Sequence, residues 1–208
     1  VGPRDGLQNE KKVLETDFKV RLIEDLVKTG VRNIEVGSFV SPKWVPQMAT
    51  TAEVIDQLTT VPGVSYSVLV PNTQGFLKVD TGRINEIAIF TAASDDFTQK
   101  NINCSVEESI ERFAPIMEMA KDKRVRVRGY VSCVMGCPYR GDVTPEEVAS
   151  VVHRLLDIGC YEVSLGDTIG VGTPEKTREL LAPLHPFVDR LAVHFHDTNS
   201  RALENILV

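Results

Sequence analysis

Short runs of β-branched and aromatic residues recur along the chain, and a helical pattern follows each of them. The runs occupy residues 31–39, 65–70, 86–92, 125–134, 161–165 and 191–196. Their starts lie about 20 to 40 residues apart, which is the length of a strand plus a crossover helix. The pattern therefore predicts parallel βαβ units.

The clearest helix signals lie in the segment VTPEEVASVVHRLLDIG. Thr144 can cap the helix, Pro145 takes its first position, Glu147 completes a capping box and Gly159 ends it. Apolar residues fall at helical spacing on one side, which predicts a face packed on the sheet; they are Val148, Val151, Val152, Leu155 and Leu156.

Similar signals predict three more helices, over residues 17–29, from residue 106 after Ser105, and from residue 174 after Thr173. Gly30 should end the first of them. Pro115 should kink or divide the second, because proline removes a backbone donor and clashes with the preceding turn.

Six or seven alternating units favour a TIM (β/α)8 barrel, although a doubly wound open sheet has the same local pattern. The chain begins in what looks like the tail of a strand at Val1 and ends inside a helical run at Val208. We therefore expect residues 1–208 to be one barrel catalytic domain that is incomplete, with further strand and helix units in a longer polypeptide.

Composition limits the classes of partner. The net charge is −6, from 23 basic and 29 acidic side chains, so no long-range attraction to nucleic acid or to an anionic membrane is expected. No apolar run reaches the roughly 18 residues that span a bilayer. The four cysteines lack CxxC spacing, which favours a reducing compartment over a disulfide scaffold or a zinc knuckle.

Two histidines close the last predicted strand, LAVHFH. Side chains alternate along a strand, so His194 and His196 should project to one face while Val193 and Phe195 project to the other. Two imidazoles on one face can bind a metal, but they can also be two satisfied polar residues at a strand end.

Arg4 and Asp5 stand on a glycine-flanked turn near the start of the chain. The carboxylate could complete a two-histidine, one-carboxylate metal set, and the guanidinium could face developing negative charge; a local surface ion pair is the alternative. Glu35 lies within a strand otherwise suited to burial, so it should meet a cation, with Arg4 a good candidate. A purely structural ion pair is equally open.

Polar residues at the carboxyl ends of parallel strands lie where α/β active sites form. In SLGDTIGVGTP, Ser164 lies on a predicted strand and Asp167 follows it on a glycine-rich turn. Asp167 is well placed for proton transfer, although aspartate is also a common turn residue. The fingerprint GxGxxG is absent, so a dinucleotide site is poorly supported.

Six motifs together resemble the 3-hydroxy-3-methylglutaryl-CoA lyases, a group of barrel metallolyases. They are RDGLQNE, IEVGSFVSPKWVPQM, NINCS, SCVMGCPY, EVSLGDTIGVGTP and VHFHDT. The Arg-Asp-Gly turn and the HxH pair also fit the broader group, which includes isopropylmalate and homocitrate synthases. SFVSPKWVPQ and SLGDTIGVGTP are more specific to the lyase.

This resemblance implies a complete barrel, a divalent cation such as Mg or Mn, and cleavage of 3-hydroxy-3-methylglutaryl-CoA into acetoacetate and acetyl-CoA. The chemistry belongs to leucine degradation and ketone-body formation. The resemblance implies three sets of residue roles. The metal ligands are Asp5, His194 and His196. The residues that are catalytic or support catalysis are Arg4, Asp167, His194 and Glu35, and the residues that bind substrate are Arg4, Gln8 and Ser164. Between the two candidate proton acceptors, Asp167 is favoured over His194.

The family's fourth ligand, an asparagine, and its glycine-rich loop with a reactive cysteine would lie beyond Val208. Gly136-Cys137-Pro138-Tyr139 resembles that loop but matches a separate family segment, so Cys133 and Cys137 are interpreted as small packing residues. The family usually has Tyr-Gly-Gln where this chain has Asn199-Ser200-Arg201.

The expected partner is an acyl-CoA thioester, whose phosphates could contact Lys11, Lys12 and Lys43. For any one of these residues, an ordinary solvated lysine is the favoured interpretation. A homodimer is expected, in the cytoplasm of a bacterium or the mitochondrial matrix of a eukaryote. Two alternatives stay open: a related Claisen-type synthase or aldolase that uses a 2-oxo acid, and a non-catalytic metal- or acyl-CoA-binding barrel protein.

Overall fold

The structure is a computed structural model that describes residues 1–208 and contains one six-stranded sheet. The strands are β1 (Asn33–Ser38), β2 (Ser65–Leu69), β3 (Glu86–Ala92), β4 (Arg126–Ser132), β5 (Glu162–Gly166) and β6 (Leu191–His194). Their order in the sheet follows the chain, from β1 to β6. Parallel pairing of β1 with β2, β2 with β3, β4 with β5 and β5 with β6 confirms the predicted βαβ units.

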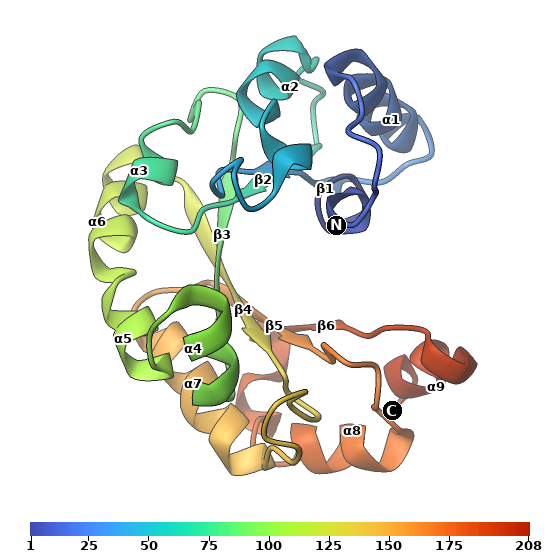
Figure 1. The fold of residues 1–208 in the computed structure, drawn as a ribbon, viewed down its shortest axis with the longest axis vertical. Helices are drawn as coiled ribbons and strands as arrows, with labels where there is room; N and C mark the ends of the chain where they lie inside the picture. Colours follow the sequence, from blue (N-terminus) through green and yellow to red (C-terminus); the bar gives the residue numbers. More distant parts are fainter. The chain divides into compact units, whose positions relative to one another are not determined.

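Helices fill the connections between these strands (Figure 1). The α-helices are α1 (Thr16–Lys28), α2 (Thr51–Gln57), α3 (Thr73–Phe76), α4 (Asp95–Ile102), α5 (Val106–Glu111), α6 (Ala114–Lys123), α7 (Pro145–Asp157), α8 (Pro174–Leu181) and α9 (Ala202–Ile206). Four short helical segments are η1 (Gly2–Gly6), η2 (Pro46–Met48), η3 (His185–Arg190) and η4 (Thr198–Ser200). No helix is both long enough and apolar enough to cross a membrane.

The predicted helix ends are confirmed where local capping sets them. Thr144 and Glu147 form a capping box at the start of α7, and Ser105 and Glu108 form another at the start of α5. Gly159 follows α7 with a φ of 108°, a conformation that glycine adopts without strain. Pro115 falls in the first turn of α6, after a break that separates α5 from α6, so the predicted division is confirmed.

The start of the chain differs from its prediction. Residues expected to form the tail of a strand and a loop instead form η1, a single π-helical turn over Gly2–Gly6. The amide of Leu7 donates to the carbonyl of Gly2, the bond that defines a π turn, and the amide of Asp5 donates to the carbonyl of Val1 at 2.7 Å. Because this turn is helical, Arg4 and Asp5 are fixed by backbone bonds and do not sit on an open loop.

The chain forms two compact units. The first contains residues 1–89 and 118–126, and the second contains residues 90–117 and 127–208. In the first unit, α1 and α2 contact each other and α2 contacts β1. Its core is apolar and fully enclosed; it includes Ile23, Ile34, Val54, Ile55 and Val68.

The second unit has its core between strands and α7. The predicted stripe of α7 is buried, and it faces buried residues of β5 such as Val163 and Leu165. Helix α7 contacts both β5 and α8, and α8 contacts α9. The prediction of one catalytic domain over residues 1–208 stays a prediction, since compact units of this kind occur within single domains.

Strand β1 has an irregular register next to Glu35, one of the candidate site residues. Its register against β2 shifts between Glu35 and Gly37. A side chain at Gly37 would collide with Thr51, whose hydroxyl accepts from the amide of Ser38 at 3.1 Å. Such bulges redirect side chains, and here the shift follows Glu35 directly.

Candidate active site

Arg4 and Glu35 form a buried ion pair in the first unit. Nε of Arg4 donates to Oε1 of Glu35 at 2.7 Å, and a second guanidinium nitrogen donates to Oε2 at 3.4 Å. The two side chains are only 9% and 2% exposed. The contact confirms the prediction that the strand carboxylate meets Arg4. A charge removed from water needs such a partner.

The remaining donors of Arg4 point to neighbours on its own segment. Nη1 donates to Oδ1 of Asp5 at 2.9 Å and lies 3.5 Å from Oε1 of Gln8. Arg4 is therefore oriented by three acceptors, and its charge is held next to the carboxylate predicted as a metal ligand. The Asp5 side chain is 32% exposed, so part of that carboxylate still faces solvent.

His194 and His196 project from the end of β6 to the same side. Their ring centroids lie 5.1 Å apart, as strand alternation predicts. Nδ1 of His196 lies 2.8 Å from the backbone carbonyl oxygen of Asp167. A carbonyl only accepts, so Nδ1 carries the hydrogen and Nε2 of the neutral ring keeps a lone pair. Metal-binding histidines are commonly held in this way.

Asp167 organises the turn that supplies this carbonyl. Its carboxylate accepts from the amide of Val171 at 3.1 Å and from the amide of Gly172 at 2.7 Å, and the residue is only 1% exposed. Its own amide donates to the carbonyl of His194 at 3.0 Å. Asp167 is thus bonded to both histidine segments through its backbone, and its carboxylate is occupied by the turn.

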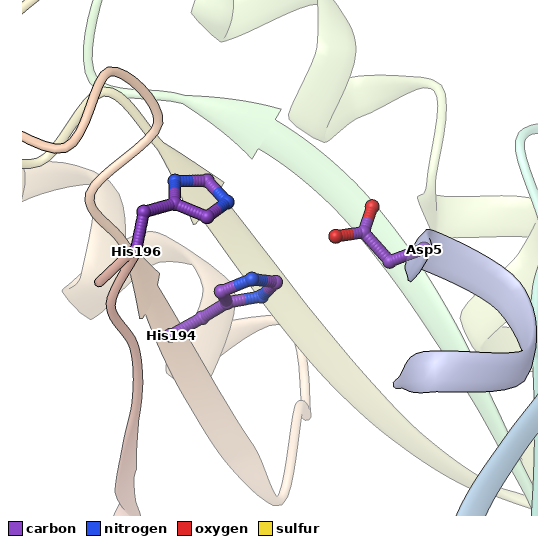
Figure 2. A group of neighbouring side chains, drawn as sticks. All are labelled: Asp5, His194 and His196. Atoms are coloured by element: carbon purple, nitrogen blue, oxygen red, sulfur yellow. The ribbon is translucent and has the colours of Figure 1, made fainter. Parts of the chain in front are cut away.

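One group of side chains has the composition of a metal site. Asp5, His194 and His196 each offer one ligand atom, and these atoms all lie within 4.8 Å of one another (Figure 2). One carboxylate oxygen with two imidazole nitrogens is a set that binds divalent cations and leaves positions for substrate oxygens. The lone pair on Nε2 of His196 fits this use.

Two supporting residues, Thr168 and Asn205, were not found from the sequence. The hydroxyl of Thr168 accepts from the amide of Cys133 at 2.8 Å, which ties the turn after β5 to the end of β4. Asn205 on α9 is 2% exposed, and a side chain added at Gly172 would lie 2.9 Å from its amide nitrogen. The only sequence signal for Asn205 is an amide placed among apolar helix residues.

Ser164 and the cysteines are also buried. Ser164 is 7% exposed on β5, between Tyr130 of β4 and Ala192 of β6 in the register of the sheet. Cys133 and Cys137 are free thiols at 0% and 2% exposure. Burial raises the pKa of the Cys133 thiol to about 12, so it stays protonated, as an interior packing residue would.

The segment after His196 has an unusual backbone. Asn199 and Ser200 have φ values of 57° and 58°, two successive left-handed residues. Asparagine tolerates this region, whereas serine is strained there. Asn199 and Ser200 are also the positions at which the sequence is expected to depart from the family that it resembles.

Comparison with known proteins gives the site its context. The HMGL-like family model matches residues 1–208. A 3-hydroxy-3-isohexenylglutaryl-CoA/hydroxymethylglutaryl-CoA lyase of Pseudomonas aeruginosa is 57% identical, over 99% of this chain and 69% of its own length. The mitochondrial hydroxymethylglutaryl-CoA lyase of Gallus gallus is 55% identical, over 100% of this chain and 70% of its own length.

Solved structures agree with the sequences. The crystal structure of hydroxymethylglutaryl-CoA lyase from Pseudomonas aeruginosa has a TM-score of 0.95 at 56% identity and covers 99% of this chain and 69% of that one. An HMG-CoA lyase from Acinetobacter baumannii in complex with coenzyme A and 3-methylmalate has a TM-score of 0.93 at 32% identity, covering 99% and 68%. The fold is therefore the TIM barrel of these lyases, incomplete relative to the full barrel.

The family model matches all 208 residues, and the identity to named carbon–carbon lyases exceeds 50%. Both findings identify the same family. This chain belongs to the HMGL-like family, among the hydroxymethylglutaryl-CoA lyases.

Proposed function

We propose that the protein cleaves 3-hydroxy-3-methylglutaryl-CoA to acetoacetate and acetyl-CoA by a retro-Claisen reaction. The reaction breaks the bond beside a tertiary alcohol, so the hydroxyl must lose its proton and the leaving thioester enolate must be stabilised. The observation that carries the proposal is the 57% identity to a lyase named for this thioester, extending over 99% of the chain.

Asp5, His194 and His196 are the proposed ligands of a divalent cation, with Mg or Mn preferred from the family resemblance. Such a cation, when bound, supplies positive charge that lowers the pKa of the substrate hydroxyl. The hydrogen bond from Nδ1 of His196 to the Asp167 carbonyl supports the proposal, because it presents Nε2 for coordination.

Arg4 is the proposed catalytic cation for the enolate oxygen. Its charge is fixed in place by Glu35, so no reorientation is needed when negative charge develops on the substrate. An interaction of this kind is strongest in the transition state and therefore raises turnover. Gln8, beside Nη1 of Arg4, and Ser164 on β5 are the proposed contacts to the acyl group.

The proton acceptor was expected to be Asp167, with His194 as the other candidate. The contacts of Asp167 favour a different role, because both of its carboxylate oxygens already accept backbone N–H groups. Protonation of either oxygen would weaken the bond that this oxygen accepts from the turn. We therefore propose that Asp167 holds His196 in position. His194 could take the proton only if its ring leaves the cation, because a coordinated neutral imidazole has no free lone pair.

Product analysis tests the function directly. The purified protein, supplied with Mg or Mn, should release acetoacetate and acetyl-CoA in equal amounts, and chelation should stop the reaction until metal is restored. The Asp5→Asn variant should need far more metal, whereas Asp17→Asn, on an exposed aspartate of α1, should not. Folded, metal-loaded protein that releases no acetoacetate would contradict the proposal. Condensation of acetyl-CoA with a 2-oxo acid would identify the synthase alternative.

A further inference from the structure

Strand β1 contains one residue more than β2 over the stretch in which the two strands pair. Glu35 pairs with Ser67 of β2. The next pair in the ladder joins Gly37 to Val68, so Val36 is the extra residue of a β-bulge. The bulge therefore begins directly after the carboxylate of the buried ion pair.

This bulge determines which side chains share a face of the sheet. Side chains alternate along a regular strand, so Glu35 and Ser38, three positions apart, would point to opposite faces. With the extra residue between them they pair with Ser67 and Leu69, which are two positions apart and share a face. If the extra residue moved to the other side of Glu35, this carboxylate would turn to the opposite face, away from Arg4.

Thr51, the first residue of α2, bonds to the backbone at the end of this bulge. Its hydroxyl oxygen accepts from the amide of Ser38 at 3.1 Å. The hydroxyl also donates to the carbonyl oxygens of Ser38 and Met48, which lie 2.9 and 2.8 Å away. Thr51 is 4% exposed, so these bonds are shielded from water. One buried side chain thus bonds both polar backbone groups of Ser38.

The absence of a side chain at Gly37 allows Thr51 to come this close to the strand. A Cβ atom at Gly37 would lie 2.6 Å from the hydroxyl oxygen and 2.7 Å from the methyl carbon of Thr51. The threonine therefore fills the space that a side chain at position 37 would need. Gly37 pairs with the neighbour of Ser67, so it faces α2 while Glu35 faces the other side of the sheet.

We propose that Thr51 is a positioning residue of the active site. It keeps the extra residue of β1 at Val36, and the bulge keeps Glu35 on the face where its carboxylate accepts from Arg4 at 2.7 Å. Thr51 lies on the α2 side of the strand, so it acts through Glu35 and does not meet the substrate. The proposal rests on the proposed function, in which Arg4 stabilises the enolate oxygen. Small displacements of such a group are costly for the rate.

Steady-state kinetics test this role with two substitutions of similar size. Thr51→Val removes the hydroxyl and keeps the shape of the side chain. At saturating metal its kcat should fall about 10- to 100-fold with the KM for the thioester unchanged, because Arg4 acts in the transition state. Thr51→Ser keeps the hydroxyl, so its kcat should stay within about twofold of the wild-type value. A normal kcat for Thr51→Val, or an equal loss in Thr51→Ser, would overturn the proposal.

Thr177→Val is the matched control for lost stability. Thr177 is 1% exposed on α8, and its hydroxyl donates to the carbonyl of Thr173 at 2.8 Å. Its replacement should lower the free energy of unfolding much as Thr51→Val does, because each removes a buried hydroxyl that bonds to the backbone. The kcat of Thr177→Val should be unchanged. An equal loss of kcat in the two variants would assign the effect to general destabilisation and would overturn the proposal.

A double-mutant cycle identifies the residue through which Thr51 acts. Glu35→Gln should itself lower kcat, and the addition of Thr51→Val should lower it little further, because both changes disturb one arrangement. If Thr51→Val lowers kcat by the same factor whether residue 35 is glutamate or glutamine, Thr51 does not act through Glu35 and the proposal fails.

The same cycle in urea unfolding needs no turnover. The losses of unfolding free energy in Thr51→Val and Glu35→Gln should not add, whereas those in Thr177→Val and Glu35→Gln should add. Additive losses in both cycles would overturn the positioning role of Thr51. Absence of acetoacetate release by the wild-type protein, together with a coupled unfolding cycle for Thr51 and Glu35, would defeat the proposed function alone.

Discussion

The two units hold their candidate catalytic residues by different means. In the first unit, Arg4 is fixed by a side-chain ion pair with Glu35, in which both partners are almost completely buried. In the second unit, His196 is fixed by a backbone carbonyl, and the side chain of Asp167 only maintains the turn that presents it. A cation is positioned by an opposite charge in the first unit, and a neutral imidazole is positioned by main-chain geometry in the second.

This difference determines how each arrangement should respond to substitution. Loss of one member of a buried ion pair leaves an uncompensated charge, which is costly for the fold. Loss of a side chain that supports a turn releases a few hydrogen bonds and shifts a carbonyl, which is cheaper. The first unit should therefore lose stability and catalysis abruptly, and the second should lose metal affinity gradually.

The largest effect is expected for Arg4→Gln. The variant should still bind metal, but its turnover should fall at least 100- to 1000-fold, about 3 to 4 kcal/mol, because a fixed positive charge facing the enolate is lost. Steady-state acetoacetate release and metal titration measure the two properties separately. Turnover close to that of the wild type would remove Arg4 from the mechanism.

Glu35→Ala should lower the free energy of unfolding more than Arg4→Gln, Asp167→Asn or Ser200→Gly does. It leaves the guanidinium of Arg4 buried with its main partner gone, which should cost about 3 kcal/mol or more of unfolding free energy. Urea denaturation gives the value. The control is Glu107→Ala, which breaks an exposed pair with Arg154 and should cost no more than about 1 kcal/mol. Equal costs for the two variants would contradict the distinction between buried and exposed pairs.

Asp167→Asn tests the arrangement in the second unit. If Asp167 positions His196, metal affinity should weaken about 10- to 100-fold, and saturating metal should restore kcat to within a few-fold. If Asp167 were the proton acceptor, kcat at saturating metal would fall about 100- to 10,000-fold. The pH profile of kcat supplies a second criterion, because only loss of the acceptor would remove a titration from it.

The smallest effect is expected for Ser200→Gly, and it is a gain. The left-handed conformation of Ser200 strains an ordinary side chain, so glycine should stabilise the protein by about 0.5 to 1 kcal/mol. Asn199→Gly should give less, since asparagine tolerates this conformation. Chemical denaturation of both variants provides the comparison, and a larger gain at position 199 than at 200 would argue against the explanation from backbone strain.

Much of this arrangement could be predicted from the sequence. The six strands and the capped ends of α5 and α7 follow from periodicity and local capping, which act over a few residues. The Arg4–Glu35 contact follows from the rule that a buried carboxylate needs a partner. The common face of His194 and His196 follows from strand alternation.

Other features have no comparable signal. The turn of η1 combines two glycines and a proline, so its residues show no period that would distinguish a helical turn from the end of a strand. The carbonyl that holds His196 belongs to the backbone, and every residue has one, so its identity cannot be read from a side chain. Asn205 reaches Gly172 only because α9 packs near the turn after β5, a contact between segments that no local sequence pattern indicates.

The close packing around Gly172 has a consequence for sequence divergence. A side chain at this position would lie within 3 Å of Met135, Asp167 and Asn205 simultaneously. A larger residue at position 172 therefore requires that three side chains move together, and one of them is the carboxylate that accepts from the amide of Gly172 itself. A deep mutational scan should show position 172 as one of the least tolerant positions of the Asp167 turn.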